Sequence, residues 1–558
     1  MPAAERVQPC LGQAKRTDRL SLALAIACIG VFVALSVWRL DTLPPVYEDE
    51  PWQASTAYKL ARQGVFGSDV FAGWNGMEQR YYGFLPLHPL ILAGVFKLFG
   101  EGLLQARLEA VGASTLTLIL TLVLARRLFG PWVGVCALGV LLLVRWTGTT
   151  YVQVTGIPFV DLARIARYDV VVPVFGLGSL LAYLFAAEGE VHRSGHARLA
   201  HWRYGLAGLL AGLAGLSHLY GLFWLVVLAA LIVWDEQPRR RLRALGWAAG
   251  GALLPWLPYA AYVLADLPEW HAQFSGYANR FELLDPRFYL NNVLEEPRRY
   301  GPGLEGRPPG VGWLARPGLW TLGVLTPASV GALAWRGAFR HDAAARAIAA
   351  PTILLPLLFA LLLRLKLVNY TLTFLPLLAI ASAWGGLHVL GWLRGRRHAR
   401  LGLALFALVG LAVLGEGLSR LALLQTSTTT PYPVFIARVH RTIPAGARVV
   451  GLHNYWFGFE DTDYRSLVVP LAWLDDGGLP LEIGLARLAP DALLLDERMQ
   501  TYLSYDARAR AGLEAWLAAS GAHLVDQVDD ATYGTMRIYS TRPSAYTGRA
   551  TRLNGGKF

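Results

Sequence analysis

The sequence has little charge for its length. Of its 558 residues, 16% are Asp, Glu, Lys or Arg, whereas an average soluble domain has about 25%. Apolar and aromatic residues make up 54%, and the mean hydropathy is +0.38. This composition excludes a soluble enzyme, a disordered scaffold and a collagen-like fibre, because apolar segments of about 20 residues must be covered by lipid. The sequence therefore indicates an integral membrane protein.

Cysteine and the common catalytic motifs are also scarce. The three cysteines are Cys10, Cys28 and Cys136, and two of them lie within apolar runs, so a disulfide framework and a cysteine metal site are both excluded. The chain contains no P-loop, no G-x-S-x-G elbow and no H-E-x-x-H motif. The glycines that recur between 205 and 215 predict close packing of a helix rather than phosphate binding.

The basic residues lie in short clusters between apolar runs, although the net charge is +12. This pattern follows the preference of Lys and Arg for cytoplasmic loops, so we expect no nucleic-acid partner. The first apolar run, 20–38, is longer than the core of a signal peptide and precedes no small-x-small cleavage site. We therefore expect residues 1–19 to form a cytoplasmic N-terminus that precedes an uncleaved first span.

The apolar runs predict eleven transmembrane spans. They lie at 20–38, 107–125, 131–150, 169–187, 204–220, 221–235, 244–264, 317–335, 347–363, 371–391 and 401–421. A further run, Phe84–Leu98, is short and broken by prolines, and counting it as a span would place five later basic clusters outside. We therefore expect this segment to lie along the outer interface and the C-terminus to lie outside the cytoplasm.

The predicted fold is a polytopic α-helical membrane protein with a small extracytoplasmic domain. Residues 20–424 form the membrane domain, and its outer loop 39–106 is the expected catalytic loop. After residue 425 helix and strand patterns alternate, which predicts an α/β domain over 425–558. Its expected helices are 434–442, 481–488 and 507–520, and its expected strands are 448–452, 492–496, 523–528 and 535–539.

An acidic group, Glu48, Asp49 and Glu50, follows the first span. One interpretation is structural, because carboxylates stabilise the N-terminus of a helix and Pro51 suits its first position. The other interpretation is catalytic, because charged residues at a membrane boundary are costly and mark functional sites. The two interpretations are compatible, since a helix start can also hold a catalytic carboxylate rigidly.

Further charged candidates lie near the outer ends of later spans. Asp169 in the run Arg167-Tyr168-Asp169 is either a functional acid or a residue that pairs with an arginine or caps a helix. His218 follows the fifth span, and Lys366 lies between the ninth span and Tyr370. For Lys366, as for Arg364, snorkelling toward the lipid headgroups is an alternative explanation.

Several of these runs carry a resemblance to a known family. Tyr47–Glu50, Tyr81–Leu90, Ala106–Leu108 and Ala125–Gly130 resemble the N-terminal half of the bacterial dolichyl-phosphate-mannose-dependent protein mannosyltransferases and their lipid A aminoarabinose transferase relatives. These are membrane glycosyltransferases of the C-type fold that use polyprenyl-phosphate sugars. The likeness continues through Arg167–Asp169, Gly212–His218 and Lys366–Pro376, and so covers roughly residues 20–390.

The resemblance implies roles for individual residues. Asp49 matches the catalytic carboxylate of the family's Asp-Glu pair, Glu50 matches its companion, and Asp169 matches a second acidic position. Where relatives have Lys-Pro-Pro this chain has Gly83–Pro86, and where they have Thr-Lys it has Ser217-His218. We therefore expect the donor phosphate to be bound by other groups, namely Lys366, Arg167, His218 and Tyr370, with Arg280, Arg298 and Arg299 as further candidates.

The resemblance implies transfer of a hexosyl or pentosyl group from a polyprenyl-phosphate donor to a lipid, glycan or protein hydroxyl. The reaction would run with inversion at the outer face of the cytoplasmic membrane, with Asp49 as the base. The main alternative is a transporter or flippase of a lipid-linked glycan, but the sequence has no internal repeat and its acidic candidates gather at one boundary. A divalent metal that bridges carboxylate and phosphate is compatible with the residues, although no ligand cluster demands one.

Overall fold

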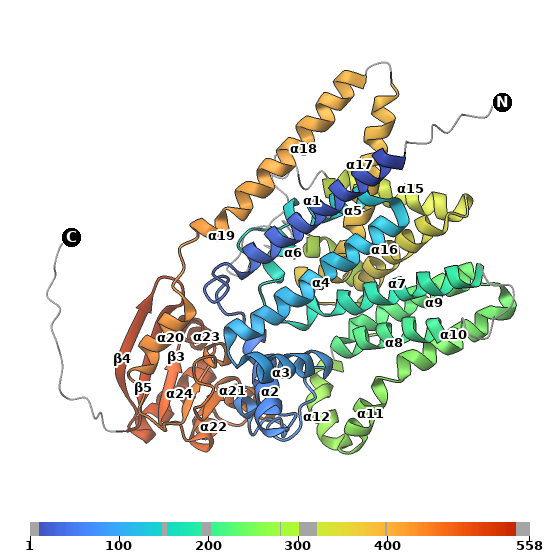
Figure 1. Ribbon diagram of the computed structural model, residues 1–558. Coiled ribbons are helices and arrows are strands. Elements are labelled where there is room, and N and C mark those ends of the chain that lie inside the picture. Colours follow the sequence, from blue (N-terminus) through green and yellow to red (C-terminus); the bar gives the residue numbers. More distant parts are fainter. Residues whose placement is uncertain are drawn as a thin grey trace, which may run out of the picture. The chain divides into compact units, whose positions relative to one another are not determined.

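The computed structural model describes residues 11–147, 153–191, 202–278, 281–300, 318, 321–396 and 399–542. The chain divides into two compact units (Figure 1). The first contains the residues up to Pro44, Tyr82–Phe99 and Leu104–Ser427, and the second contains Pro45–Tyr81, Gly100–Leu103 and the residues from Thr428 onward. A segment near the N-terminus therefore belongs to the same unit as the C-terminal domain.

The first unit is helical. Its longer helices are α1 (Leu11–Val37), α3 (Leu87–Phe99), α4 (Leu103–Phe129), α5 (Pro131–Leu143), α7 (Val172–Val191), α8 (Trp202–Ser217), α9 (Phe223–Asp235), α10 (Pro238–Leu253), α11 (Trp256–Leu264), α12 (Leu267–Ala278), α13 (Pro286–Glu295), α15 (Thr326–Phe339), α16 (Ala343–Leu362), α17 (Leu375–Arg394) and α18 (Ala399–Leu421). Shorter helical segments are α6 (Pro158–Leu162), η2 (Tyr168–Val170), η4 (Leu219–Leu222), η5 (Glu296–Tyr300), η9 (Val368–Thr373) and α19 (Leu423–Thr426).

Six helices among the described residues are long and apolar enough to cross a membrane. They are Thr17–Val37, Leu103–Phe129, Tyr168–Ala187, Ala343–Leu362, Leu375–Arg394 and Ala399–Thr426. The other five predicted spans correspond to shorter or broken helices. Helix α5 ends at Leu143, α8 and α9 have 16 and 13 residues, the run 244–264 divides into α10 and α11 beside Pro255, and α15 begins at Thr326. The chain is thus a multi-pass membrane protein, and the count of eleven spans remains a prediction.

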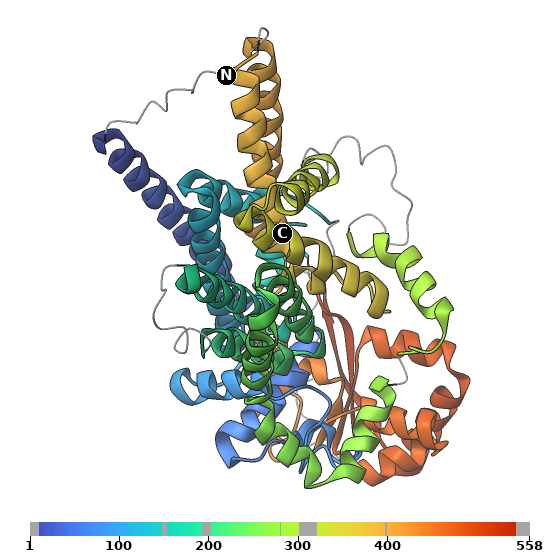
Figure 2. The same cartoon turned by 90° about the vertical axis from the view of Figure 1, so that its right-hand side faces the viewer.

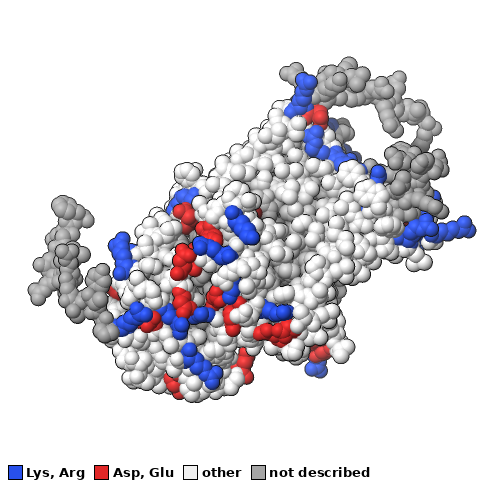
Figure 3. All heavy atoms as spheres, turned by 60° about the horizontal axis from the view of Figure 1, so that its bottom comes forward, with Lys and Arg blue, Asp and Glu red and all other residues white. Residues whose placement is uncertain are grey.

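Apolar surface is abundant on the first unit. On α18, which forms a hairpin with α17 (Figure 2), Leu405, Leu408 and Leu411 are 55%, 63% and 65% exposed. Figure 3 shows a broad area with almost no charged side chains beside a region where both signs are mixed. Leucines that are exposed in this way on a long apolar helix are expected to face lipid.

The glycines of α8 allow close helix packing, as the sequence predicts. A Cβ atom at Gly208 would lie 1.9 Å from the carbonyl oxygen of Ala248, and one at Gly212 would lie 2.4 Å from that of Ala252. Ala248 and Ala252 both belong to α10, which lies beside α8 in Figure 1. Small residues at this interface let the two helix backbones approach closely.

Buried arginines hold the end of α1 and the turn that follows it. The guanidinium of Arg164, 1% exposed, donates to the carbonyl oxygens of Leu35 (2.6 Å), Ser36 (2.9 Å), Trp38 (2.8 Å), Arg39 (3.3 Å) and Leu43 (3.0 Å). Arg107, also buried, donates to the carbonyl oxygens of Leu40 and Pro44, each at 2.8 Å. The last four carbonyls of a helix have no partner inside the helix, so these arginines supply donors that lipid cannot.

The second unit contains a five-stranded sheet. Its strands β1 (Val449–Gly451), β2 (Tyr464–Ser466), β3 (Ala492–Leu495), β4 (His523–Asp530) and β5 (Gly534–Ser540) lie in the order β2-β1-β3-β5-β4. Strand β1 is parallel to β2 and β3, whereas β5 is antiparallel to β3 and β4. The surrounding helices are α2 (Asp49–Gln63), α20 (Tyr432–His440), α21 (Val468–Gly477), α22 (Leu481–Leu488), α23 (Glu497–Tyr505) and α24 (Ala507–Ser520). The predicted α/β domain is therefore confirmed, with β2, α21 and α23 as additional elements.

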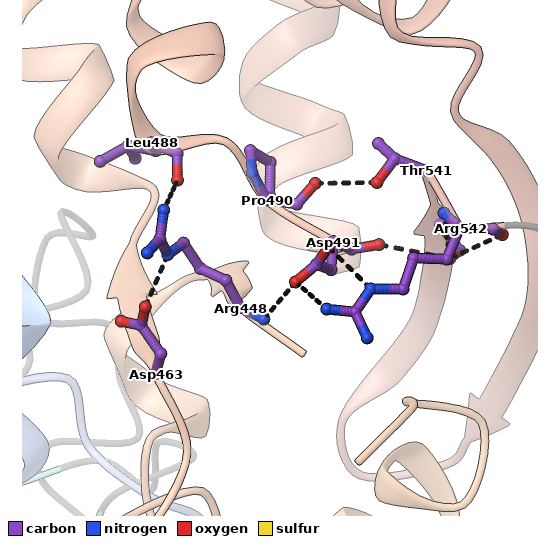
Figure 4. Close-up of polar contacts among 8 residues, drawn as sticks. Arg448, Asp463, Leu488, Pro490, Asp491, Thr541 and Arg542 are labelled. Atoms are coloured by element: carbon purple, nitrogen blue, oxygen red, sulfur yellow. Dashed lines mark hydrogen bonds and ion pairs between the residues drawn. The ribbon is translucent and has the colours of Figure 1, made fainter. Parts of the chain in front are cut away.

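One end of this sheet is held by ion pairs (Figure 4). Both carboxylate oxygens of Asp491 accept from the guanidinium of Arg542 at 2.8 Å, and one also accepts from the backbone N–H of Arg448 at 2.8 Å. The Arg448 side chain in turn donates to Asp463 at 2.6 Å. These contacts connect the starts of β1 and β3 with the residues that follow β5.

Helix α2 packs on the C-terminal part of the same unit. The Trp52 ring lies 5.0 Å from the ring of His453, and the Tyr58 hydroxyl donates to Asp461 at 3.0 Å across 403 positions of sequence. The guanidinium of Arg465 donates to the carbonyl of Asp69 at 2.9 Å. Residues 45–81 are thus built into the α/β domain through contacts between residues that are distant in sequence.

We expect Arg164→Met to destabilise the first unit. The substitution leaves several buried carbonyls without donors, and each such carbonyl costs about 1–3 kcal/mol. Thermal unfolding in detergent should therefore shift to clearly lower temperature, and Arg164→Lys should recover only part of the loss because lysine lacks the planar fork. Arg203→Met is a suitable control, since Arg203 donates to a single carbonyl, that of Phe185, in an exposed setting. A melting temperature of Arg164→Met equal to that of the control would contradict this role.

We expect His453 to make the second unit less stable in acid. Burial lowers the pKa of His453 from 6.5 to about 4, although a backbone hydrogen bond with Glu48 acts in the opposite direction. Below pH 6.5 His453 takes up a proton in the unfolded chain but stays neutral in the folded one. The free energy of unfolding therefore decreases as the pH is lowered from about 6.5 to about 4, by about 3 kcal/mol in all. The melting temperature should fall more for the wild type than for His453→Phe between about pH 7 and about pH 4.5. Parallel curves for the two proteins would show that His453 does not contribute.

Candidate functional site

The acidic group after the first span forms the first turn of α2. Asp49 is the first residue of the helix and is partly exposed, whereas Glu50 is fully buried. A carboxylate oxygen of Glu50 accepts a hydrogen bond from the backbone N–H of Tyr47 at 2.9 Å. The acidic first turn of the structural interpretation is therefore present, but the helix begins two residues earlier than predicted, so Pro51 is its third residue rather than its first.

Gln53 lies one turn after Glu50 on α2. It was not identified as a candidate from the sequence. Its side chain is fully buried, and neither atom of its carboxamide has a hydrogen-bond partner among the described residues. A buried amide without partners is costly, and such groups occur where function demands them. No motif in the sequence distinguishes this glutamine from others on an amphipathic helix.

Asp169 lies in a buried ion pair in the first unit. One of its carboxylate oxygens is 2.8 Å from Nε of Arg167, and the other accepts from the hydroxyl of Tyr220 at 2.5 Å. The side chains of Arg167 and Asp169 are both 2% exposed. The expectation that Asp169 pairs with an arginine is thus confirmed, and Tyr220 is a partner that sequence reasoning missed.

Aromatic rings connect this ion pair with two further candidates. The His218 ring stacks on Tyr168 at 4.4 Å, and its Nδ1 accepts from the backbone N–H of Tyr220 at 3.3 Å. The ring of Tyr220 lies 5.0 Å from that of Tyr370. The segments before α7, after α8 and before α17 therefore bring Arg167, Asp169, His218 and Tyr370 into one buried cluster.

Lys366 lies at the edge of this cluster in a second group of charges. Its Nζ is 2.9 Å from a carboxylate oxygen of Glu296, and the same carboxylate accepts from Nε of Arg299 at 2.7 Å. The guanidinium of Arg299 lies 5.7 Å from the ring centroid of Tyr370. The Lys366 side chain is only 5% exposed, whereas that of Arg364 is 65% exposed and lies 3.8 Å from Glu282.

The other arginines of the loop 265–316 differ in their surroundings. Arg280 lies outside the described residues. Arg298 is 62% exposed and pairs with Glu295 at 3.4 Å, whereas Arg299 is completely buried. The spacing of Glu296 and Arg299 is the only sequence signal for their pairing, and this spacing is too common on helical turns to identify a site.

The described residues contain no group of three or more His, Cys, Asp or Glu side chains that could hold a metal ion. The first unit contains buried cations and tyrosine hydroxyls, which suit an anion. The second unit contains a partly exposed carboxylate at the positive end of a helix, which can accept a proton from a substrate.

No protein-family model and no curated protein matches the chain, but solved structures resemble it over most of its length. ArnT from Cupriavidus metallidurans in the apo state is 16% identical, with a TM-score of 0.60 over 94% of this chain and 98% of that protein. The structure of ArnT bound to undecaprenyl phosphate gives a TM-score of 0.58 over 93% of this chain. The archaeal oligosaccharyltransferase AglB from Archaeoglobus fulgidus, in complex with an inhibitory peptide and a dolichol-phosphate, is 13% identical, with a TM-score of 0.54 over 94% of this chain and 75% of that protein.

Likeness at this level of identity concerns the fold. ArnT is matched over nearly its full length, so both the helical unit and the C-terminal unit have their counterparts there. The chain therefore has the fold of the C-type membrane glycosyltransferases, as its resemblance in sequence predicts.

Proposed function

We propose that the protein transfers a sugar from a polyprenyl-phosphate donor to the hydroxyl of a lipid, a glycan or a protein. The observation that carries this proposal is the structural likeness to ArnT bound to undecaprenyl phosphate, which covers 93% of this chain and 98% of ArnT. The buried cations in the first unit support it, since they suit the phosphate of such a donor. In the proposed orientation the reaction takes place at the outer face of the cytoplasmic membrane, with residues 1–19 inside and the α/β domain outside.

Asp49 is the general base in this proposal. It accepts the proton of the acceptor hydroxyl while the acceptor oxygen bonds to the anomeric carbon and the bond from that carbon to the phosphate oxygen breaks. A lipid phosphate is already a good leaving group, so no strong general acid is required. A single displacement of this kind inverts the configuration at the anomeric carbon. Glu50 positions Asp49, because its contact with the N–H of Tyr47 fixes the start of α2.

The departing phosphate is stabilised by Lys366 and Arg167, with His218 and Tyr370 beside them. Negative charge accumulates on the phosphate as its bond to the sugar breaks, so preorganised cations lower the barrier to reaction. Asp169 holds Arg167 through the 2.8 Å contact and is itself held by Tyr220. Its proposed role is therefore to orient the guanidinium.

The proposal is tested with purified protein in nanodiscs and a panel of polyprenyl-phosphate sugars. At least one donor should be consumed with release of polyprenyl phosphate and appearance of the sugar on an acceptor, and the anomeric configuration of the product should be inverted. A folded protein that consumes none of the donors, but moves a lipid-linked glycan across a vesicle membrane, would overturn the proposal in favour of a flippase.

We expect Asp49→Asn to act mainly on kcat. The amide keeps the size of the side chain but cannot accept the proton, and general-base catalysis contributes about 10²–10⁴-fold, or roughly 3–5 kcal/mol of barrier. Glu50→Gln should cost less, because it weakens a positioning contact. Asp475→Asn is the matched control, since Asp475 is a 54% exposed carboxylate of the same unit that pairs with Arg508. A well-folded Asp49→Asn protein with the kcat of this control would exclude Asp49 as the base.

A further inference from the structure

Two buried cations in the first unit share one carboxylate. Glu296 accepts from Nε of Arg299 at 2.7 Å and from its Nη2 at 3.1 Å, and it accepts from Nζ of Lys366 at 2.9 Å. The side chains of Arg299, Lys366 and Glu296 are 0%, 5% and 12% exposed. Two cations and one anion leave this group with one surplus positive charge.

The remaining hydrogen bonds of the two cations are to neutral carbonyl groups. Arg299 donates to the carbonyls of Leu365 at 3.4 Å and Leu367 at 3.3 Å, and Lys366 donates to that of Ala360 at 3.2 Å. Within the described residues, no second carboxylate forms an ion pair with either cation. Because an uncompensated buried charge is costly, this group favours the arrival of an anion.

The geometry around Glu296 is one that a phosphate can adopt. A planar guanidinium donates two parallel hydrogen bonds to carboxylate or phosphate oxygens alike, and an ammonium beside it serves as a point charge for either anion. The two oxygens of Glu296 therefore occupy positions that two phosphate oxygens would take.

We propose that Glu296 is an internal competitor for the phosphate of the lipid donor, an inference that rests on the proposed function. Without donor, the carboxylate holds Arg299 and Lys366. When the donor binds, its phosphate replaces the carboxylate on both cations, and Glu296 moves away. When polyprenyl phosphate leaves, Glu296 returns to the cations.

The competitor addresses a problem of product release. The donor phosphate is a diester with one negative charge, whereas the product is a monoester whose second pKa is about 6 and which therefore carries nearly two charges at neutral pH. The same cations thus bind the product more strongly than the donor. A carboxylate that competes for them weakens binding of the product and shortens its residence.

The test compares Glu296→Gln with Glu295→Gln in binding of undecaprenyl phosphate. Glutamine keeps the size of the side chain but competes poorly for the cations, so Glu296→Gln should bind the lipid more tightly, by about 5- to 150-fold in Kd, the usual range for coupling between two ligands. Glu295→Gln removes the same charge one residue away, from a 45% exposed side chain that pairs with Arg298. It should bind like the wild type.

If Glu296→Gln does not fold, the comparison is made in a variant that lacks Lys366, in which the charges of Arg299 and Glu296 balance. Lys366→Met alone removes one cation, and Lys366→Met with Glu296→Gln also frees Arg299, so the double variant should bind undecaprenyl phosphate more tightly than the single one. Affinity that is unchanged or weaker when Glu296 is replaced, in either background, overturns the competitor and leaves Glu296 as a structural partner. Tighter binding with no sugar transfer from any donor supports the competitor and overturns the proposed function.

Discussion

Carbonyl groups at the end of a membrane helix need hydrogen-bond donors, and lipid supplies none. In this protein Arg164 and Arg107 supply them at the end of α1 and along the turn to Pro44. Arg39, in that turn, donates to the carbonyl of Ser427 at 2.8 Å. Arginine side chains therefore bind the carbonyls of the first-unit residues at two of the places where the chain passes into the second unit, Pro44 and Ser427.

Buried charged side chains in the first unit form small groups in which positive and negative charges nearly balance. Arg167 and Asp169 cancel each other, whereas Arg299, Lys366 and Glu296 do not. In a medium of low polarity a surplus of one charge is felt strongly by any anion that enters. The ring of Tyr220, whose hydroxyl donates to Asp169, lies 5.0 Å from that of Tyr370, and the Tyr370 ring lies 5.7 Å from the guanidinium of Arg299. The surplus positive charge supports the proposed binding of a phosphate.

The sequence predicted the helical membrane fold and most elements of the α/β domain, because both depend on local periodicity. Helix α22 begins and ends where its pattern predicts, at Leu481 and Leu488. The strand β2 was not predicted, because a strand of three residues is too short to show an alternation of apolar and polar residues. Asp169 and Lys366 were found because charge at a membrane boundary is rare, whereas Glu296 and Tyr220 were not, since their importance lies in partners far away in the chain. The grouping of α2 with the C-terminal domain has the same cause.

The second unit combines a segment that follows the first span with the last part of the chain. Contacts such as that between Tyr58 and Asp461 join residues 403 positions apart. During synthesis the ribosome delivers α2 long before His453 and Asp461, which it contacts, so the acidic helix lacks these partners while the intervening helices are made. The helix that carries Asp49 reaches its final surroundings only when translation is nearly complete. A nascent chain that stalls or is cut short therefore leaves an inserted membrane domain whose acidic helix has never been assembled.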